Sequence, residues 1–416
     1  MRIAAIARPI ENIIRHPASA GGNGRTTLSA RNRVRTSKPS AHTAQLLAKG
    51  RALHRGGRLA EAREIYERIL QREPAHFDAL HAMGSVAAQA GNLMLALECL
   101  DQAAGVSATS ADVFHLRGLV QKDLGRWDEA RTSVERALAL RPDFADAHAS
   151  LGNVLAGLDR LEGSLASFDR AIALGADQAQ LHYNRGNVLA RMHRLDDALA
   201  AYNRAMAINP NAAQIHANRG SVLKDLGELD GALSSFDRAI ALNASIAEVW
   251  YNRGLVLASL GERENALASY DRAIALNANL DFAHYNRANV LDGLNRLEDA
   301  LTAYDRALKI NAGNADAWCN RAKVLNDLWR FDTALASAER AIALRPDLAE
   351  AYCNRGNAEL ELKRLDAALA SYDQAIAIRA DYAEAHFNRG NVLKDMCRSQ
   401  EAAASYRHAL ELRPGY

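Results

Sequence analysis

The sequence predicts an all-α protein folded as a right-handed α-solenoid, or superhelix, of eleven helix–turn–helix repeats of 34 residues. A small residue returns every 34 residues, without insertion or deletion, from Thr43 to Tyr416. Within each copy, apolar residues recur at intervals of three and four, which is the period of one helical face. The recurring small residues are Gly50, Gly84, Gly118, Gly152, Gly186, Gly220, Gly254, Ala288, Ala322, Gly356 and Gly390.

Each repeat is expected to contain two antiparallel helices. In the copy at 247–280, we expect a first helix over 247–260, a polar turn over 261–265 and a second helix over 266–276. Gly261 is suited to end the first helix, because glycine readily adopts the left-handed conformation found there. A break follows the second helix, and short polar residues are expected to cap the next one. These expected N-caps are Asp143, Asn211, Ser245, Asp347 and Asp381.

Small and large residues stand at fixed repeat positions, counted here from Thr43 as position 1. Position 8 is Gly or Ala, position 20 is Ala or Ser, position 24 is often Tyr and position 27 is almost always Ala. Together with Trp250 and Trp318 at position 4 and Pro at position 32 in several copies, this pattern resembles the tetratricopeptide repeat. The resemblance covers about nine-tenths of the chain. It implies that the first helices line a concave groove that binds a protein or peptide ligand, either an extended peptide or a partner helix.

Three segments are predicted from composition and from repeat regularity. Residues 1–42 carry eight Lys or Arg residues against Glu11 alone, and they are expected to form a disordered basic leader. An organellar transit peptide or a basic arm for acidic partners is the alternative for this leader. Residues 43–178 hold four divergent repeats, and residues 179–416 hold seven regular ones, where we expect the ligand groove.

Asparagines form a regular row in the later repeats. A carboxamide offers both a donor and an acceptor, so a row of them can hold the main chain of an extended peptide without reading its sequence. The predicted peptide-binding residues at position 6 are Asn184, Asn218, Asn252, Asn286, Asn320, Asn354 and Asn388. Position 9 adds Asn187 and Asn289, and position 5 adds Tyr251 and Tyr285 as apolar anchors.

This row resembles the asparagine ladder in the superhelix of the protein O-GlcNAc transferases. The resemblance implies an alternative function, in which the chain is a substrate-recognition array associated with or derived from such a glycosyltransferase. A second alternative concerns the asparagines themselves, which could stabilise the array by bonding to the backbone of the next repeat. The tyrosines could equally serve packing alone.

Arginines and histidines form two further rows. Position 7 is Arg in eight copies, and position 25 is mostly acidic, so we predict an ion pair within each repeat, such as Arg253 with Asp271. A basic strip for nucleic acid is the weaker hypothesis, because acids lie beside the arginines. Histidines at position 4, such as His216 and His284, are interpreted as packing residues where the related repeats carry Trp.

No catalytic motif is found in the sequence, so the chain is predicted to be a scaffold or adaptor and not an enzyme. We expect no cofactor, no bound metal, no nucleic-acid partner and no membrane segment. Four cysteines in 416 residues cannot form a disulfide framework, which favours a reducing compartment and a cytoplasmic location. The last predicted helix, 402–412, is expected to leave an apolar face open for a partner or for a second copy of the chain.

Overall fold

The computed structural model describes residues 41–415, and the predicted leader lies outside them except for Ala41 and His42. Twenty-two α-helices and no strands are found in this range, so the predicted solenoid fold is confirmed. The helices are α1 (Ala41–Arg55), α2 (Leu59–Arg72), α3 (Phe77–Gln89), α4 (Leu93–Val106), α5 (Ala111–Asp123), α6 (Trp127–Leu140), α7 (Ala145–Gly157), α8 (Leu161–Ala173), α9 (Ala179–Arg191), α10 (Leu195–Ile208), α11 (Ala213–Asp225), α12 (Leu229–Leu242), α13 (Ala247–Ser259), α14 (Arg263–Leu276), α15 (Asp281–Gly293), α16 (Leu297–Ile310), α17 (Ala315–Asp327), α18 (Phe331–Leu344), α19 (Ala349–Glu361), α20 (Leu365–Ile378), α21 (Ala383–Asp395) and α22 (Ser399–Leu412).

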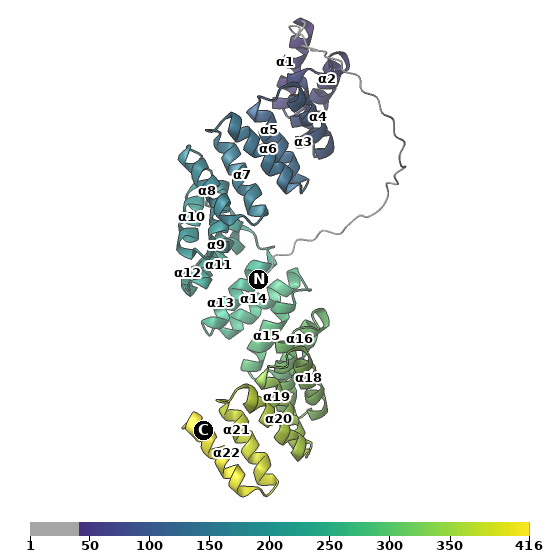
Figure 1. Ribbon diagram of the computed structural model, residues 1–416. Helices are drawn as coiled ribbons and strands as arrows, with labels where there is room; N and C mark the ends of the chain where they lie inside the picture. The colour runs from purple at the N-terminus through teal and green to yellow at the C-terminus, as the bar shows by residue number, and fades with distance from the viewer. Residues whose placement is uncertain (1–40, 416) are drawn as a thin grey trace, which may run out of the picture.

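The helices pack in consecutive antiparallel pairs, one pair for each repeat. The second helix of a pair also contacts the first helix of the next pair, and successive first helices contact one another. The result is an elongated, curving array that runs from α1 to α22 (Figure 1). Because each repeat contacts only its neighbours, the core is a string of clusters along the array and not one central cluster.

The close crossing inside each repeat depends on the small residue at position 8. A Cβ atom built on Gly254 would lie 2.6 Å from Cε1 of Tyr270, a residue at position 24. Ala266 and Ala273, on the same face of α14, have no exposed surface. The side chain of Tyr270 therefore occupies the space that a larger residue at position 8 would need, which explains the pairing of small and large residues along the sequence.

The turn between the two helices of every repeat has a left-handed residue at position 15. Five of these residues are glycines with φ between 73° and 81°. The other six are Asp159, His193, Asn295, Trp329, Lys363 and Cys397, with φ between 56° and 61°. A left-handed conformation ends a helix tightly, and residues other than Gly, Asn and Asp adopt it at an energetic cost.

The N-cap residue lies at repeat position 34, one residue after the predicted caps. Ile246 and Leu348 stand at this position, and neither makes a side-chain capping bond. Side-chain caps occur at the same position in three repeats, as when Ser110 Oγ accepts from the backbone N–H of Val113 at 3.4 Å. Position 34 faces the junction between two repeats, where Leu280 is buried, so packing outweighs capping there.

Replacing Lys363 by Gly is expected to raise the free energy of unfolding by about 0.5–1 kcal/mol, because Gly adopts the φ of 59° without the steric cost that a side chain imposes. Urea denaturation would measure the change. The matched control is Lys309→Gly within α16, where the same exchange at an ordinary helical residue should cost about 1 kcal/mol. Equal effects of the two substitutions would contradict the assignment of strain to position 15.

Candidate functional site

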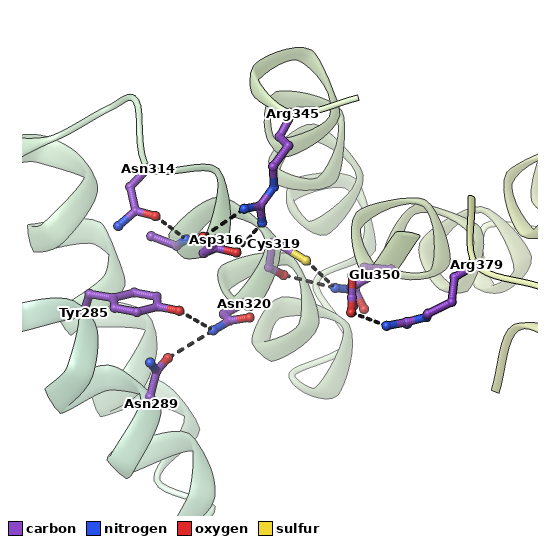
Figure 2. Close-up of polar contacts among 11 residues, drawn as sticks. Tyr285, Asn289, Asn314, Asp316, Cys319, Asn320, Arg345, Glu350 and Arg379 are labelled. Carbon is purple, nitrogen blue, oxygen red and sulfur yellow. Dashed lines mark hydrogen bonds and ion pairs between the residues drawn. The ribbon is translucent and has the colours of Figure 1, made fainter. Parts of the chain in front are cut away.

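The predicted asparagine row lies on the first helices of repeats five to eleven, and all seven position-6 side chains are half-buried. Their amide groups bond mostly to the preceding repeat. Asn320 Nδ2 donates to Asn289 Oδ1 at 3.0 Å and to Tyr285 Oη at 3.3 Å (Figure 2). Asn184 Nδ2 donates to Asn153 Oδ1 at 2.7 Å in the same way. These side chains therefore link neighbouring repeats, whatever else they bind.

The position-9 asparagines stand at the centre of a three-residue linkage. Asn289 Oδ1 accepts from Tyr304 Oη at 2.6 Å as well as from Asn320 Nδ2, so one carbonyl oxygen joins position 24 of its own repeat to position 6 of the next. The same linkage joins Tyr202, Asn187 and Asn218, and also Tyr372, Asn357 and Asn388. Within residues 41–415, the Nδ2 groups of these position-9 asparagines donate to no other residue. Their N–H groups therefore remain without a partner among the described residues.

Asn252 differs from the rest of the row. The preceding repeat has Ala217 at position 5 and Ser221 at position 9, so it offers neither the tyrosine hydroxyl nor the asparagine oxygen used elsewhere. No hydrogen bond joins the Asn252 side chain to any residue in the described range. Asn286 instead donates to Tyr251 Oη at 3.1 Å. Asn252 is therefore the position-6 carboxamide with both its donor and its acceptor unused within the array.

The two predicted tyrosine anchors form hydrogen bonds within the array. Tyr251 and Tyr285 are half-buried, and their hydroxyls accept from the asparagine of the following repeat. Burial raises the pKa of Tyr251, which keeps its hydroxyl protonated at neutral pH. The ring of Tyr251 meets Phe282 edge-on, with centroids 4.5 Å apart. Phe282 is 37% exposed and was not predicted, although it is the one aromatic residue at position 2 in the sequence.

The arginine row makes ion pairs between repeats, so the prediction of a pair within each repeat was wrong. Arg253 Nε donates to Asp237, on the preceding repeat, at 2.7 Å, and not to Asp271 of its own repeat. Its Nη1 donates to Ser269 Oγ, on its own second helix, at 2.8 Å. Position 25 follows the buried position 24 by about 100° around the helix, which turns its carboxylate toward the next repeat. Seven of the eight arginines therefore link two repeats. The exception is Arg355, which contacts Ser371 and Glu359 of its own repeat.

Further ion pairs connect position 2 with position 31 of the same repeat. Asp316 pairs with Arg345, and Glu350 accepts from Arg379 Nη1 at 2.7 Å (Figure 2). The hydrogen bond from Arg141 holds the pKa of Asp112 below its usual range at the equivalent place. The position-2 acids therefore have an arginine partner in these three repeats.

The histidines at position 4 were interpreted as packing residues, and His182, His216 and His284 are buried. Four of the five rings contact a backbone carbonyl of the preceding repeat, whereas Nε2 of His182 lies 2.8 Å from Asp177 Oδ1. Nε2 of His216 lies 2.9 Å from the carbonyl of Pro210, at position 32 of the preceding repeat. The indole Nε1 of Trp250 donates to the carbonyl of Ala244, at the same position of its preceding repeat, at 2.9 Å. Burial lowers the pKa of His284, which favours its neutral form. Histidine thus replaces tryptophan because both rings can carry an N–H to this carbonyl.

No group of three or more His, Cys, Asp or Glu side chains with metal-binding geometry is found within residues 41–415. The four cysteines are free thiols, and burial raises the pKa of Cys319 and Cys353 to about 12. The backbone carbonyl of Cys319 accepts a hydrogen bond from Asn354 Nδ2 at 3.0 Å.

None of the helices from α1 to α22 is long and apolar enough to cross a membrane.

Comparisons with known families match the repeats directly. Family models described as tetratricopeptide repeat match residues 43–86, 115–179, 179–212, 217–281, 315–348 and 383–416. A model described as TPR repeat matches residues 294–328 and 356–396. Together these matches cover more than half of the chain. No curated protein matches the sequence.

Several solved structures are also similar to this chain. YrrB, a TPR protein with an unusual peptide-binding site, is 26% identical, with a TM-score of 0.41, and the match covers 45% of this chain and 96% of YrrB. The APC/C hetero-tetramer Cut9–Hcn1 is 13% identical, with a TM-score of 0.48 and coverage of 91% and 95%. Yeast Tom70 is 16% identical, with a TM-score of 0.36 and coverage of 89% and 92%.

Proposed function

Because this chain belongs to the tetratricopeptide repeat family, we propose that it is a non-catalytic scaffold that binds an extended peptide along the asparagine row. The first helices of repeats five to eleven carry this row, and proteins built from stacked repeats use such continuous faces for binding. A catalytic role would need unlike groups converging on one pocket, and the described repeats present the same few residue types again and again.

The unused amide donors of the asparagine row support an extended ligand in particular. Asn252 and the position-9 asparagines Asn187, Asn289 and Asn357 offer N–H groups along the same face, and an extended peptide has free main-chain carbonyls to accept from them. A partner helix satisfies its own main-chain groups internally, so it would gain less from such a row. Each hydrogen bond contributes about 0.5–1.5 kcal/mol net, so several are needed for useful affinity.

Changing Asn252 to Ala is expected to weaken peptide binding about 2- to 13-fold without lowering the free energy of unfolding, since its side chain bonds to no described residue and Ala is the better helix former. Twelve-residue peptides selected from a random display library on the wild-type protein would serve as ligands, with affinities from fluorescence anisotropy. Arg272→Ala, an exposed change on the second helix α14, is the control. Equal binding by wild type and Asn252→Ala, for every selected peptide, would remove the asparagine row from the ligand site.

The same substitution at Asn320 should behave differently. Asn320→Ala is expected to destabilise the protein by about 1–2 kcal/mol, because it removes two hydrogen bonds to the preceding repeat. Comparing the two variants therefore separates an effect on peptide binding from an effect on the stability of the array. A variant that replaced several asparagines of the row together would change both. Thermal melting followed by circular dichroism would measure the difference.

Two alternatives from the sequence stay predictions. The O-GlcNAc-transferase-like role rests on the asparagine row alone. It would be tested by assaying the purified protein, with whatever proteins accompany it, for sugar-nucleotide turnover.

Self-association would use α22, where Leu410 is 47% exposed. Leu410 lies beside a hollow of about 420 Å³ that Phe387 and Tyr406 also line. Sedimentation velocity of wild type and Leu410→Asp would measure it.

A further inference from the structure

A hollow of about 330 Å³ opens on the asparagine face between repeats nine and eleven. Asn357, Asn388 and Asn391 line it, so it is continuous with the row proposed to hold the peptide main chain. Its other walls come from the end of α17, from the turn that contains Trp329, and from the end of α19. A side chain of a peptide bound along the row could therefore enter this hollow.

Trp329 is the most unusual residue in the hollow. It stands at position 15 with a φ of 61°, and its side chain is 76% exposed, more than any other large apolar residue in the described range. Both properties are unfavourable for folding, and the ring gains only an edge contact with Phe331 at 6.0 Å between centroids. Trp318, in contrast, has Arg321 over its ring at 5.7 Å. No described cation covers Trp329, so its face is available to a ligand.

The charged groups in the hollow are all acidic. Asp327 and Glu361 line it, and no Lys or Arg residue does. Lys323 Nζ donates to Asp327 at 3.0 Å, but it also donates to Asp292 at 2.9 Å and can keep that partner. Glu361 is exposed, and it forms no ion pair with any residue in the described range. A cation in this hollow would meet an aromatic face on one side and carboxylates on the other.

We propose that the hollow binds an arginine side chain of the peptide held along the asparagine row, with the guanidinium against Trp329 and its N–H groups directed to Glu361 and Asp327. The proposal rests on the proposed function of the row. Arginine fits better than lysine, because its planar guanidinium can stack on the indole while it donates two parallel hydrogen bonds to a carboxylate. The acidic lining selects against peptides with Asp or Glu at the same register.

The test uses the peptides selected on the full-length protein and replaces each arginine by citrulline, a neutral side chain of nearly the same shape. In wild type, citrulline at one register is expected to weaken binding about tenfold. In Trp329→Gly the same exchange should weaken binding less than in wild type, because the ring is gone and only the carboxylates of Glu361 and Asp327 remain. This variant keeps the fold, since Gly occupies position 15 in five other repeats. Lys363→Gly, the same change at position 15 of the next repeat, is the matched control and should retain the tenfold effect.

The outcomes separate this proposal from the function on which it rests. Selected peptides that depend on Asn252 but show no arginine at a common register would overturn the arginine site and leave the groove intact. A citrulline effect that persists undiminished in Trp329→Gly and in Glu361→Gln would overturn it as well. Peptides that bind without any dependence on Asn252 or Trp329 would reject both the groove and its arginine site. A smaller citrulline effect in each of the two variants than in wild type, with the full effect retained in Lys363→Gly, is the supporting result.

Discussion

Truncating Tyr304 to Ala is expected to lower the free energy of unfolding by about 3–5 kcal/mol, the largest effect of any single change considered for this protein. Tyr304 has no exposed surface, and its ring fills the crossing between α15 and α16. Its hydroxyl donates to Asn289 Oδ1 at 2.6 Å. Burial raises the pKa of Tyr304, so the hydroxyl stays protonated as a donor. The truncation therefore leaves a cavity and also breaks the linkage to repeat nine.

Tyr304→Phe separates these two contributions. The ring remains and only the hydrogen bond to Asn289 is lost, so the cost should fall to about 1 kcal/mol. Urea denaturation followed by circular dichroism would measure both variants. Because repeats contact only their neighbours, Tyr304→Ala should also split the transition into two steps, one for each side of repeat eight. Similar costs for Ala and Phe would show that the ring does not fill the crossing.

Changing Arg321 to Ala is expected to cost about 1.5–3 kcal/mol, because one side chain bridges two repeats. Nε of Arg321 donates to Asp305 of repeat eight at 2.7 Å, and its Nη1 donates to Ser337 of its own repeat at 2.5 Å. The guanidinium is only 20% exposed, so its bonds are less screened than those of a surface pair. Arg321→Lys should restore little of the lost free energy of unfolding, because one ammonium group cannot donate to both Asp305 and Ser337 as the forked guanidinium does.

A double-mutant cycle identifies the partner of Arg321. Pairing Arg321→Ala with Asp305→Ala should give a coupling energy of about 0.5–1 kcal/mol, since the carboxylate is half exposed. Pairing it with Glu339→Ala, the acid at position 25 of its own repeat, should give none. The opposite ranking would restore the prediction of an ion pair within each repeat.

The elements of this fold could be predicted from the sequence almost completely, and the site only in part. The period follows from the recurrence of small residues along the chain, and the two helices and the small residues at positions 8 and 20 follow from the pattern within one repeat. The asparagine row was recognised from the sequence. The sequence did not reveal that Asn252 is the position-6 asparagine whose side chain forms no hydrogen bond within the described range. That difference depends on Ala217 and Ser221 of the preceding repeat, which matter only once the two first helices lie side by side. Trp329 was missed because a turn residue carries no periodic signal.

What the sequence by itself determined is the type of unit and how many times it is stacked. Helical periodicity and the match of small to large residues act within 34 residues, so they can be read without knowing how repeats meet. Only the tertiary structure decided which acid each arginine binds and which asparagine side chains form hydrogen bonds to other repeats. It also decided where acidic residues and an exposed indole line the same hollow. These contacts cross from one repeat to the next, and the angle between neighbouring repeats sets them. That angle comes from the packing of whole helix pairs, which no single repeat encodes.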